Sequence, residues 1–288
     1  MKLNRRQFLS KSGLGLVSAA LLASRCGPAP EQVVAPDPAL DFGPFRMGFQ
    51  SYSLRHFQEL DDLVREAGRL GVPYVELYRE HLSVDAPPET IRGVQEALTG
   101  VGITVNAYGV ERFSDDHERN ESIFRFGQQL GVMNLSAAPT PDAFESLEEL
   151  VARYDIRIAI HNHGPEDELW QMPQSILEAV DGRDARIGAC VDTGHYLRSG
   201  VSPVEAIRML GQRVLGVHFK DYDEDLNEVV PGDGQLDVAA SLEALRDVGF
   251  NGPLSLEYEE HPEDPVPHMK AALERISAVL KQWKGAAA

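Results

Sequence analysis

The stretch "IRIAIHNHG", Ile156–Gly164, is an apolar run that ends in two histidines around an asparagine. A second run, "IGACVDTGH" (Ile187–His195), is apolar in the same way and ends in an aspartate and a histidine. Short apolar runs of this kind are typical of buried strands in a parallel sheet. Histidines at strand ends are often satisfied polar residues near a surface. The alternative is that they face a shared pocket, where they bind a metal or move a proton.

Runs of the same kind recur from Phe45 to the end of the chain and alternate with amphipathic, helix-period segments. The eight β-rich runs are Phe45–Ser53, Val72–Tyr78, Ile103–Gly109, Val132–Ala138, Ile156–Gly164, Ile187–His195, Val214–Asp221 and Pro253–Glu260. Helical segments between or after them include Leu60–Gly71, Pro87–Gly102, Glu118–Gly131, Ser146–Tyr154, Pro203–Arg213, Ser241–Gly249 and His268–Trp283. Several of these segments stop at a glycine, which favours a C-terminal cap.

Eight strand-then-helix units predict an α/β chain that folds as a single (β/α)₈ TIM barrel over residues 45–285. The rival is a doubly wound open sheet, which usually has a Gly-rich phosphate loop after its first strand. Here the first strand leads into "QSYSLRHF" (Gln50–Phe57), which contains no such loop. The sequence therefore favours the barrel.

The composition excludes some partners. The 288 residues include 27 basic and 45 acidic ones, which gives a net charge of −18. Such a surface repels nucleic-acid backbones and anionic membranes. The hydrophobic content of 43% is sufficient for a core. Two cysteines, Cys26 and Cys190, do not indicate a disulfide framework.

Residues 1–30 resemble a twin-arginine export signal, with Arg5 and Arg6 ahead of a short apolar stretch. That stretch is too short and too rich in small residues for a comfortable membrane span. Cys26 follows "LLASR", which is close to a lipoprotein cleavage box, but Arg25 departs from the usual small residue. Residues 31–44 are Pro-rich and predict a flexible tether. We therefore expect an exported, periplasmic protein, with a lipid anchor at Cys26 and a homo-oligomer left open.

Polar side chains stand where the predicted strands end, which is where a barrel of this kind places its site. They are Glu76, Asn106, His161, His163, Asp192, His195, His218, Lys220 and Glu257. Taken singly, each of these residues can be explained without a metal. Asp192 could cap a helix, His218 could be a buried histidine and Glu257 could be solvated. Together, imidazoles and carboxylates from successive strands predict a divalent-metal site for Mn, Co, Zn or Fe, whereas Mg prefers oxygen ligands alone.

At these residues the chain resembles the sugar phosphate isomerase/epimerase family, the xylose isomerase-like barrels, whose superfamily also contains metal-dependent AP endonucleases. The motifs are "VELY", "HNHG", "VDTGH", "VHFKD", "PGDGQLD" and "LSLEYE", spread over about Phe45 to Trp283. The resemblance implies that Asp192, His218 and Glu257 bind the metal. It places His161 where the sugar epimerases have a glutamate, so a proton shuttle between two carboxylates is in doubt. Some relatives with this "HNH" form act on keto-inositols or 3-keto-glycosides by elimination or hydration.

The resemblance implies a metal-dependent sugar isomerase or epimerase in which proton removal beside a carbonyl gives an enediolate. His161 is expected to be a metal ligand, and His163 and Glu257 are the candidate bases. Glu76 is a further catalytic candidate, with a substrate contact or a structural hydrogen bond as alternatives. His195, Lys220 and Asn106 are expected to contact substrate; a solvated surface lysine is the alternative for Lys220.

Three other function classes follow from the same residues. A metal-dependent lyase or hydratase acting on 3-keto-glycosides or keto-inositols shares the enediolate and is the main alternative. A non-catalytic carbohydrate-binding barrel is a minor alternative, which the retained metal ligands argue against. A DNA-repair endonuclease is disfavoured by the charge of −18 and by the absence of extra histidines on the second and third strands. Since an exported enzyme rarely meets sugar phosphates, we expect an unphosphorylated sugar or keto-sugar as substrate.

Overall fold

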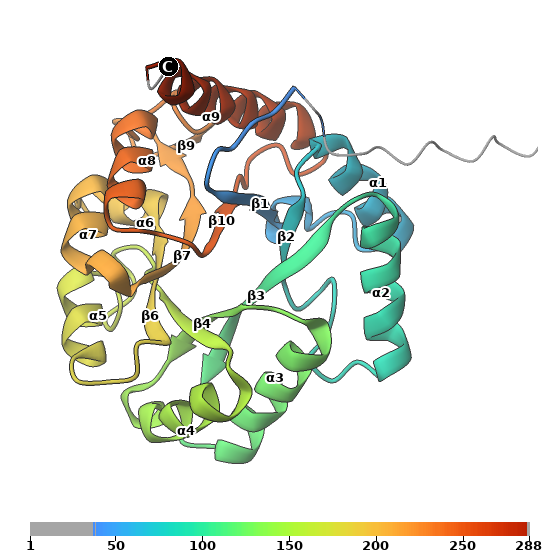
Figure 1. The fold of residues 1–288 in the computed structure, drawn as a ribbon, viewed down its shortest axis with the longest axis vertical. Helices are drawn as coiled ribbons and strands as arrows, with labels where there is room; N and C mark the ends of the chain where they lie inside the picture. Colours follow the sequence, from blue (N-terminus) through green and yellow to red (C-terminus); the bar gives the residue numbers. More distant parts are fainter. Residues whose placement is uncertain (1–36, 38, 287–288) are drawn as a thin grey trace, which may run out of the picture. The chain divides into compact units, whose positions relative to one another are not determined.

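The computed structural model describes residue 37 and residues 39–286. Its parallel strands close into a barrel in the order β1-β10-β7-β6-β5-β4-β3-β2 (Figure 1). The barrel strands are β1 Arg46–Gln50, β2 Tyr74–Leu77, β3 Thr104–Phe113, β4 Asn134–Pro139, β5 Arg157–His161, β6 Ile187–Asp192, β7 Val214–Phe219 and β10 Pro253–Leu256. The predicted single (β/α)₈ barrel is confirmed. The predicted signal at 1–30, with Cys26, lies outside the described residues.

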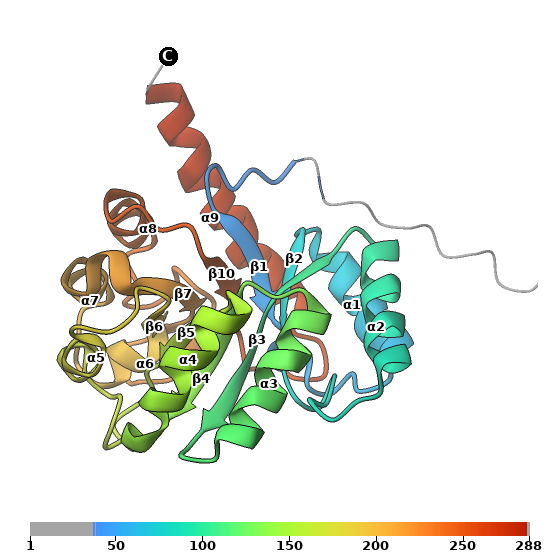
Figure 2. The same ribbon diagram turned by 60° about the horizontal axis from the view of Figure 1, so that its bottom comes forward.

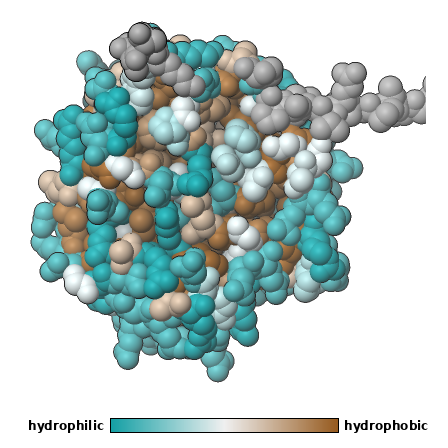
Figure 3. Space-filling view, in the orientation of Figure 1, coloured by the Kyte–Doolittle hydropathy of each residue, from teal (hydrophilic) through white to brown (hydrophobic). Residues whose placement is uncertain are grey.

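Helices surround the barrel strands on the outside (Figure 1). They are α1 Leu60–Leu70, α2 Pro88–Gly100, α3 His117–Leu130, α4 Phe144–Tyr154, α5 Pro173–Val180, α6 Thr193–Arg198, α7 Pro203–Leu210, α8 Val238–Asp247 and α9 Val266–Ala286. Short 3₁₀ turns are η1 Ser51–Leu54, η2 Pro141–Ala143 and η3 Gly211–Arg213. Figure 3, in the same orientation, shows hydrophilic residues along the outer helices. In the part of the chain that the structure describes, no helix combines the length and apolar character needed to cross a membrane.

The helices form where an apolar stripe faces the barrel and end where the sequence supplies a cap. Helix α1 buries Leu63, Ala67 and Leu70 and ends at Gly71, whose φ of 71° is in the left-handed region. Only glycine adopts that region without steric cost, so the predicted stop signal works as expected. Helix α3 ends in the same way at Gly131.

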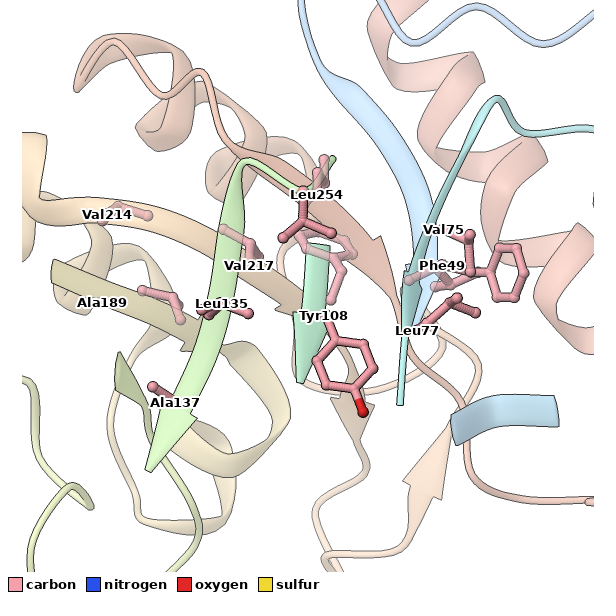
Figure 4. Close-up of a cluster of buried hydrophobic side chains, with 14 of the residues drawn as sticks. Phe49, Val75, Leu77, Tyr108, Leu135, Ala137, Ala189, Val214, Val217 and Leu254 are labelled. Atoms are coloured by element: carbon pink, nitrogen blue, oxygen red, sulfur yellow. The ribbon is translucent and has the colours of Figure 1, made fainter. Parts of the chain in front are cut away.

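Side chains on each barrel strand alternate between the helices and the barrel interior. Figure 4 shows a cluster of buried apolar side chains from several strands, among them Phe49 on β1, Val75 on β2 and Leu254 on β10. Inside the barrel, Ala159 and Cys190 are fully buried and form a small cluster with Leu215. His161 and Asp192 each stand two residues after Ala159 and Cys190 on the same strands, so the alternation directs them toward the barrel axis as well.

The described part of the predicted tether packs on the barrel. The Asp41 amide donates to Ser277 Oγ on α9 (2.8 Å), and the rings of Phe45 and Trp283 lie 6.3 Å apart. Leu40 and Phe42 pack against the core. Figures 1 and 2 both show the segment before β1 beside α9. Residues 39–44 are therefore part of the folded unit.

A two-stranded antiparallel hairpin follows β7, formed by β8 (Asp221–Tyr222) and β9 (Glu228–Val229). The buried Asp221 carboxylate organises the loop after it. It accepts hydrogen bonds from the backbone amides of Gly232, Gly234 and Leu236 at 2.8, 2.9 and 2.8 Å. Because a buried carboxylate is costly unless it is hydrogen-bonded, these contacts fix the loop "PGDGQLD" beside the barrel mouth.

Candidate metal centre and pocket

Four side chains from the strand ends converge inside the barrel mouth. His161 Nε2 lies 3.0 Å from His218 Nδ1 and 3.5 Å from Asp192 Oδ2. Glu257 Oε2 lies 3.2 Å from His218 Nδ1. One ligand atom from each of the four lies within 4.8 Å of the others, and all four residues are buried. The structure thus brings together the four residues that the sequence predicted as metal ligands.

Asn162, the middle residue of "HNH", locks two of the strand ends together. Its Nδ2 donates to the Asp192 carbonyl (3.0 Å), and its Oδ1 accepts from the Asp192 amide (2.8 Å). The buried amide side chain therefore continues the ladder between β5 and β6 for one more residue. This pairing fixes Asp192 relative to His161.

Asp192 also begins helix α6. Its Oδ1 accepts a hydrogen bond from the His195 amide (2.8 Å), so the capping role considered for it is real. Its Oδ2 is buried and has no hydrogen-bond partner among the described residues. An orphaned buried carboxylate oxygen that faces two imidazoles is a strong sign of a cation site, because such an oxygen is otherwise costly.

The donor set fits a divalent transition metal. Two ligand atoms that are each about 2.1 Å from one ion lie roughly 3.0–3.5 Å apart at ordinary coordination angles. The contacts of His161 with His218 (3.0 Å), of His218 with Glu257 (3.2 Å) and of His161 with Asp192 (3.5 Å) fall in this range. Two carboxylates and two neutral imidazoles carry a charge of about −2, which a divalent cation balances.

The electrostatics of the cluster also suit a cation. Burial lowers the pKa of His161 to about 3, so this ring stays neutral and can bind a metal. Burial opposes ionisation of Glu257, but Lys220 and His218 outweigh it and lower the pKa to about 2. Burial also opposes ionisation of Asp192, but His195, His161 and Lys220 outweigh it and lower the pKa of Asp192 below its usual value. Both carboxylates are therefore ionised at any ordinary pH.

Glu76 lies behind His218, on the side away from the cluster. Its Oε1 is 3.1 Å from His218 Nε2, and its Oε2 accepts a hydrogen bond from Ser255 Oγ (2.9 Å). Glu76 is 2% exposed and does not line the pocket. A carboxylate on the far nitrogen of a metal-binding histidine holds the ring's orientation.

The cluster forms part of the wall of a cavity of about 510 Å³. His161, His218 and Glu257 line one side, and Tyr52 and Tyr78 line another, with their rings 5.3 Å apart in an edge-to-face arrangement. Aromatic faces beside polar groups and a metal site are suited to a polyol or sugar ring, whose C–H and O–H groups need both kinds of surface.

Two further histidines line this cavity but lie outside the cluster of four. The His163 ring lies 4.5 Å from the His161 ring, and its Nδ1 is 3.2 Å from Asp167 Oδ2. His195 Nε2 lies 4.0 Å from Asp192 Oδ2, which is too long for a hydrogen bond. Both predicted residues therefore lie where a bound molecule would meet them.

Lys220 is buried, unlike the solvated lysine considered as an alternative. Its ammonium pairs with Glu259 and lies 3.8 Å from Glu228 Oε2 and 3.9 Å from Glu257 Oε2. Burial opposes the charge of Lys220, but Glu257, Asp192, Glu228 and Glu259 outweigh burial and raise the pKa well above the usual value. Lys220 is a fixed positive charge under Glu257 and does not line the cavity.

Asn106, a predicted substrate contact, lies in an irregular part of β3. The β2–β3 register passes from Val75 opposite Val105 to Glu76 opposite Ala107, so Asn106 occupies a bulge in β3. It is buried and is not part of the cavity lining. Its Nδ2 has no hydrogen-bond partner among the residues that the structure describes.

Sequence reasoning missed several residues that shape the site. Asn162 could have been found, since it stands between two selected histidines. Tyr52, Tyr78, Asp167 and Arg198 gave no signal, because their proximity to the cavity depends on how loops from different strands fold back over the barrel mouth.

Comparisons with known proteins agree with this architecture. A family model described as a xylose isomerase-like TIM barrel matches residues 139–282. An inosose dehydratase from Clostridium botulinum is 28% identical over 135 residues, which is 40% of this chain and 45% of that protein. An inosose isomerase from Bacillus velezensis is 26% identical over 159 residues, 49% of this chain and 55% of that protein. The chain thus spans about half the length of the curated relatives it matches.

Solved structures share the fold at low identity. A 3-keto-D-glucoside 4-epimerase from E. coli aligns with a TM-score of 0.65 and 16% identity, covering 81% of this chain and 99% of that one. A probable 3-DHS dehydratase from Bacillus anthracis aligns with a TM-score of 0.64 and 16% identity, covering 82% and 99%. The barrel, the strand-end site and the family model together place the chain: it belongs to the xylose isomerase-like TIM barrel family.

Proposed function

We propose that this protein is a divalent-metal-dependent enzyme that removes the proton beside the carbonyl of an unphosphorylated keto-sugar or keto-inositol. The observation that carries the proposal is the buried convergence of His161, Asp192, His218 and Glu257 under a cavity of about 510 Å³. Bound to these residues, Mn, Co, Zn or Fe would act as a Lewis acid toward the carbonyl oxygen and so acidify the neighbouring C–H. The mixed donor set makes Mg the less favoured ion.

His163 is the proposed base. A carboxylate can only accept hydrogen bonds, so the contact with Asp167 places the ring proton on Nδ1 and leaves a lone pair on Nε2. Proton removal by Nε2 turns the ring into an imidazolium, which the Asp167 carboxylate stabilises. His163 lines the cavity, whereas Glu257 belongs to the metal cluster and Glu76 lies behind His218. We therefore assign Glu76 a positioning role in place of the catalytic role that the sequence suggested.

One base on one side of the substrate favours elimination. The proton that His163 takes from carbon can be delivered to a hydroxyl on the adjacent carbon, which leaves as water while the carbon–carbon double bond forms. His163 is then neutral again, and the products are an unsaturated ketone and water. We accordingly place a dehydratase (lyase) first. The curated relatives named inosose dehydratase support this order.

Isomerisation or epimerisation is the second candidate. The position of the Glu257 carboxylate at the cavity favours it. Its ionised carboxylate enters the cavity from the end of β10, while His163 follows β5. Two bases from separate strands would allow a proton to leave one face of the enediolate and return on the other. The inosose isomerase among the relatives and the epimerase fold neighbours are consistent with this outcome.

The substrate is proposed to be unphosphorylated because residues 1–30 are proposed to direct export. A second cavity of about 800 Å³ has Arg79, Val110 and His163 in common with the lining of the first. This neighbouring space supports 3-keto-glycosides, whose aglycone needs room beside the reacting ring, as an alternative to free keto-inositols.

Proton NMR in D₂O of the metal-loaded protein, with a panel of keto-inositols, 3-keto-sugars and 3-keto-glycosides, tests the proposal. Loss of water or an aglycone with a new enone signal is the expected result. Deuterium beside the carbonyl with all substituents retained would establish isomerisation or epimerisation in its place. Without exchange or turnover of any substrate by metal-loaded protein, the non-catalytic carbohydrate-binding role would take precedence.

A further inference from the structure

An ion pair between helix α6 and the loop after β5 reaches the pocket histidine His195. Arg198, one turn further along α6, donates from Nη1 to His195 Nδ1 (3.0 Å). The same guanidinium is held by Glu166 from the loop after β5, with Nη1–Oε1 and Nη2–Oε2 both 3.1 Å. A bidentate pair of this kind fixes the plane of the guanidinium as well as its position. None of the sequence motifs pointed to either residue.

The contact decides where the His195 ring keeps its proton. A guanidinium has donors only, so His195 Nδ1 must accept with its lone pair. In the neutral ring the proton is then on Nε2, and this nitrogen faces the metal cluster, 4.0 Å from Asp192 Oδ2. Because that distance is too long for a hydrogen bond, the N–H group is free to meet a ligand in the cavity that His195 lines.

We infer that Arg198, held by Glu166, is a positioning residue that fixes His195 as a neutral hydrogen-bond donor toward a substrate oxygen in the pocket. A neutral imidazole in this role polarises a carbonyl or steadies an enediolate oxygen without transferring its proton, as in triosephosphate isomerase. The identity of that oxygen rests on the proposed function. The tautomer itself does not.

Gly164, the last residue of "HNHG", makes the arrangement possible. A Cβ at this position would lie 2.5 Å from Arg198 Nη1 and 2.7 Å from Glu166 Oε2. An alanine would therefore push the guanidinium away from both partners. Gly164 thus leaves room for the Arg198 guanidinium, and this guanidinium determines which ring nitrogen of His195 is protonated.

The inference is tested by long-range ¹H–¹⁵N NMR of the histidine rings in the full chain. The spectra are taken after metal removal and again with Zn²⁺, and His195 is assigned by the signals lost in His195→Gln. We expect bare Nδ1 and protonated Nε2 in both states. The double variant Glu166→Arg with Arg198→Glu keeps an ion pair but turns a carboxylate toward Nδ1. In that variant the proton should move to Nδ1.

Three single variants complete the test. Arg198→Lys, which retains a donor, should keep the original tautomer. Gly164→Ala should shift the Nδ1 signal as its hydrogen bond is lost. Arg208→Met, which removes an exposed arginine on α7, should change nothing. A wild-type proton on Nδ1 would overturn the inference, as would an unchanged tautomer in the double variant. If that variant does not fold, an unmoved Nδ1 signal in Gly164→Ala would overturn it equally. Failure of the proposed function would appear differently, as absent turnover with the expected tautomer intact.

Discussion

The rings of His163 and His195 lie 5.6 Å apart in one cavity and have opposite partners on Nδ1. His163 meets the carboxylate of Asp167, and His195 meets the guanidinium of Arg198. The first partner only accepts and the second only donates, so in the neutral rings Nε2 has a lone pair in His163 and a proton in His195. Two identical side chains thereby gain different chemistry from their neighbours.

Replacing His163 should remove proton abstraction and leave the metal site intact. We expect His163→Gln to lower kcat by about 10²–10⁴-fold, the usual contribution of a positioned base. Asp167→Asn should cost less, because the ring remains and only its orientation and charge stabilisation suffer. Turnover and metal affinity are measured on the same preparations, with the exposed His56→Gln as control. Unchanged kcat in His163→Gln would assign the base elsewhere.

Glu76 should act through metal affinity. Since it holds the far nitrogen of His218, Glu76→Gln should weaken metal binding by about 10–100-fold, as is typical for the outer partner of a metal-binding histidine. Calorimetric titration with Mn²⁺, Co²⁺ and Zn²⁺ measures the change. At saturating metal, kcat should recover to near the wild-type value. A kcat that stays low with the site fully loaded would restore the catalytic role that the sequence suggested for this residue.

The carboxylates of the cluster should be indispensable. Asp192→Asn and Glu257→Gln each remove a proposed ligand and one negative charge, so each should abolish metal binding or turnover. Asp225→Asn, at an exposed position of the β8–β9 hairpin, is the matched control and should leave both unchanged. Circular dichroism confirms that each variant is folded. Full activity in both ligand variants would refute the site assignment.

Metal binding should release a proton at neutral pH. Burial opposes protonation of His218, but Cys190, Glu76 and Glu257 outweigh it and raise the pKa well above its usual value, so the metal-free ring is protonated. A metal needs the neutral ring, so affinity should rise by about tenfold per pH unit while one proton is displaced. The pKa of His161 is lowered to about 3, so this ring has no proton to release near neutral pH. Calorimetry in buffers of different ionisation enthalpy counts the protons, and a count near zero would contradict the prediction.

Glu228 should make the fold less stable as the pH rises. Burial raises its pKa from 4.5 to about 7, with Lys220 only partly offsetting the effect. The unfolded chain ionises this group more readily. The contribution of Glu228 to the free energy of unfolding is therefore largest below about pH 4.5 and is lost as the pH rises through 7. Glu228→Gln should remove this component and add about 1–3 kcal/mol at pH 8 relative to the wild type. Thermal unfolding at pH 5 and pH 8 checks the sign, with the exposed Glu243→Gln as control.

Alternation of strands and helices was sufficient to predict the barrel, because each β-rich run has its own apolar pattern and each helix its own stop signal. The hairpin of β8 and β9 was not predicted. Its strands are two residues each, and they are held by Asp221 and its loop contacts, which no periodicity reveals. Likewise β3 continues to Phe113, four residues past the predicted end at Gly109.

The site residues likewise fall into those that the strand order predicts and those that it does not. His161, Asp192, His218 and Glu257 end their strands, so the barrel topology alone brings them together. The environment of Lys220 depends on carboxylates from β9 and from the end of β10. The contact of Arg198 with Glu166 depends on how the loop after β5 lies against the end of α6. Distances of this kind arise only after the chain has folded, and therefore single-sequence patterns could not supply them.

Closure of the barrel also sets an order of events during protein synthesis. Strand β1 pairs with β10, so the first strand has no neighbour on one side until the last strand exists. Glu257 follows that last strand, after His161, Asp192 and His218 have already been made. A nascent chain that grows by about 5–20 residues per second holds an incomplete ligand set until its final segment leaves the ribosome. An ion bound at the proposed site would therefore be selected by the finished barrel, from the metals present in the compartment where the chain completes its fold.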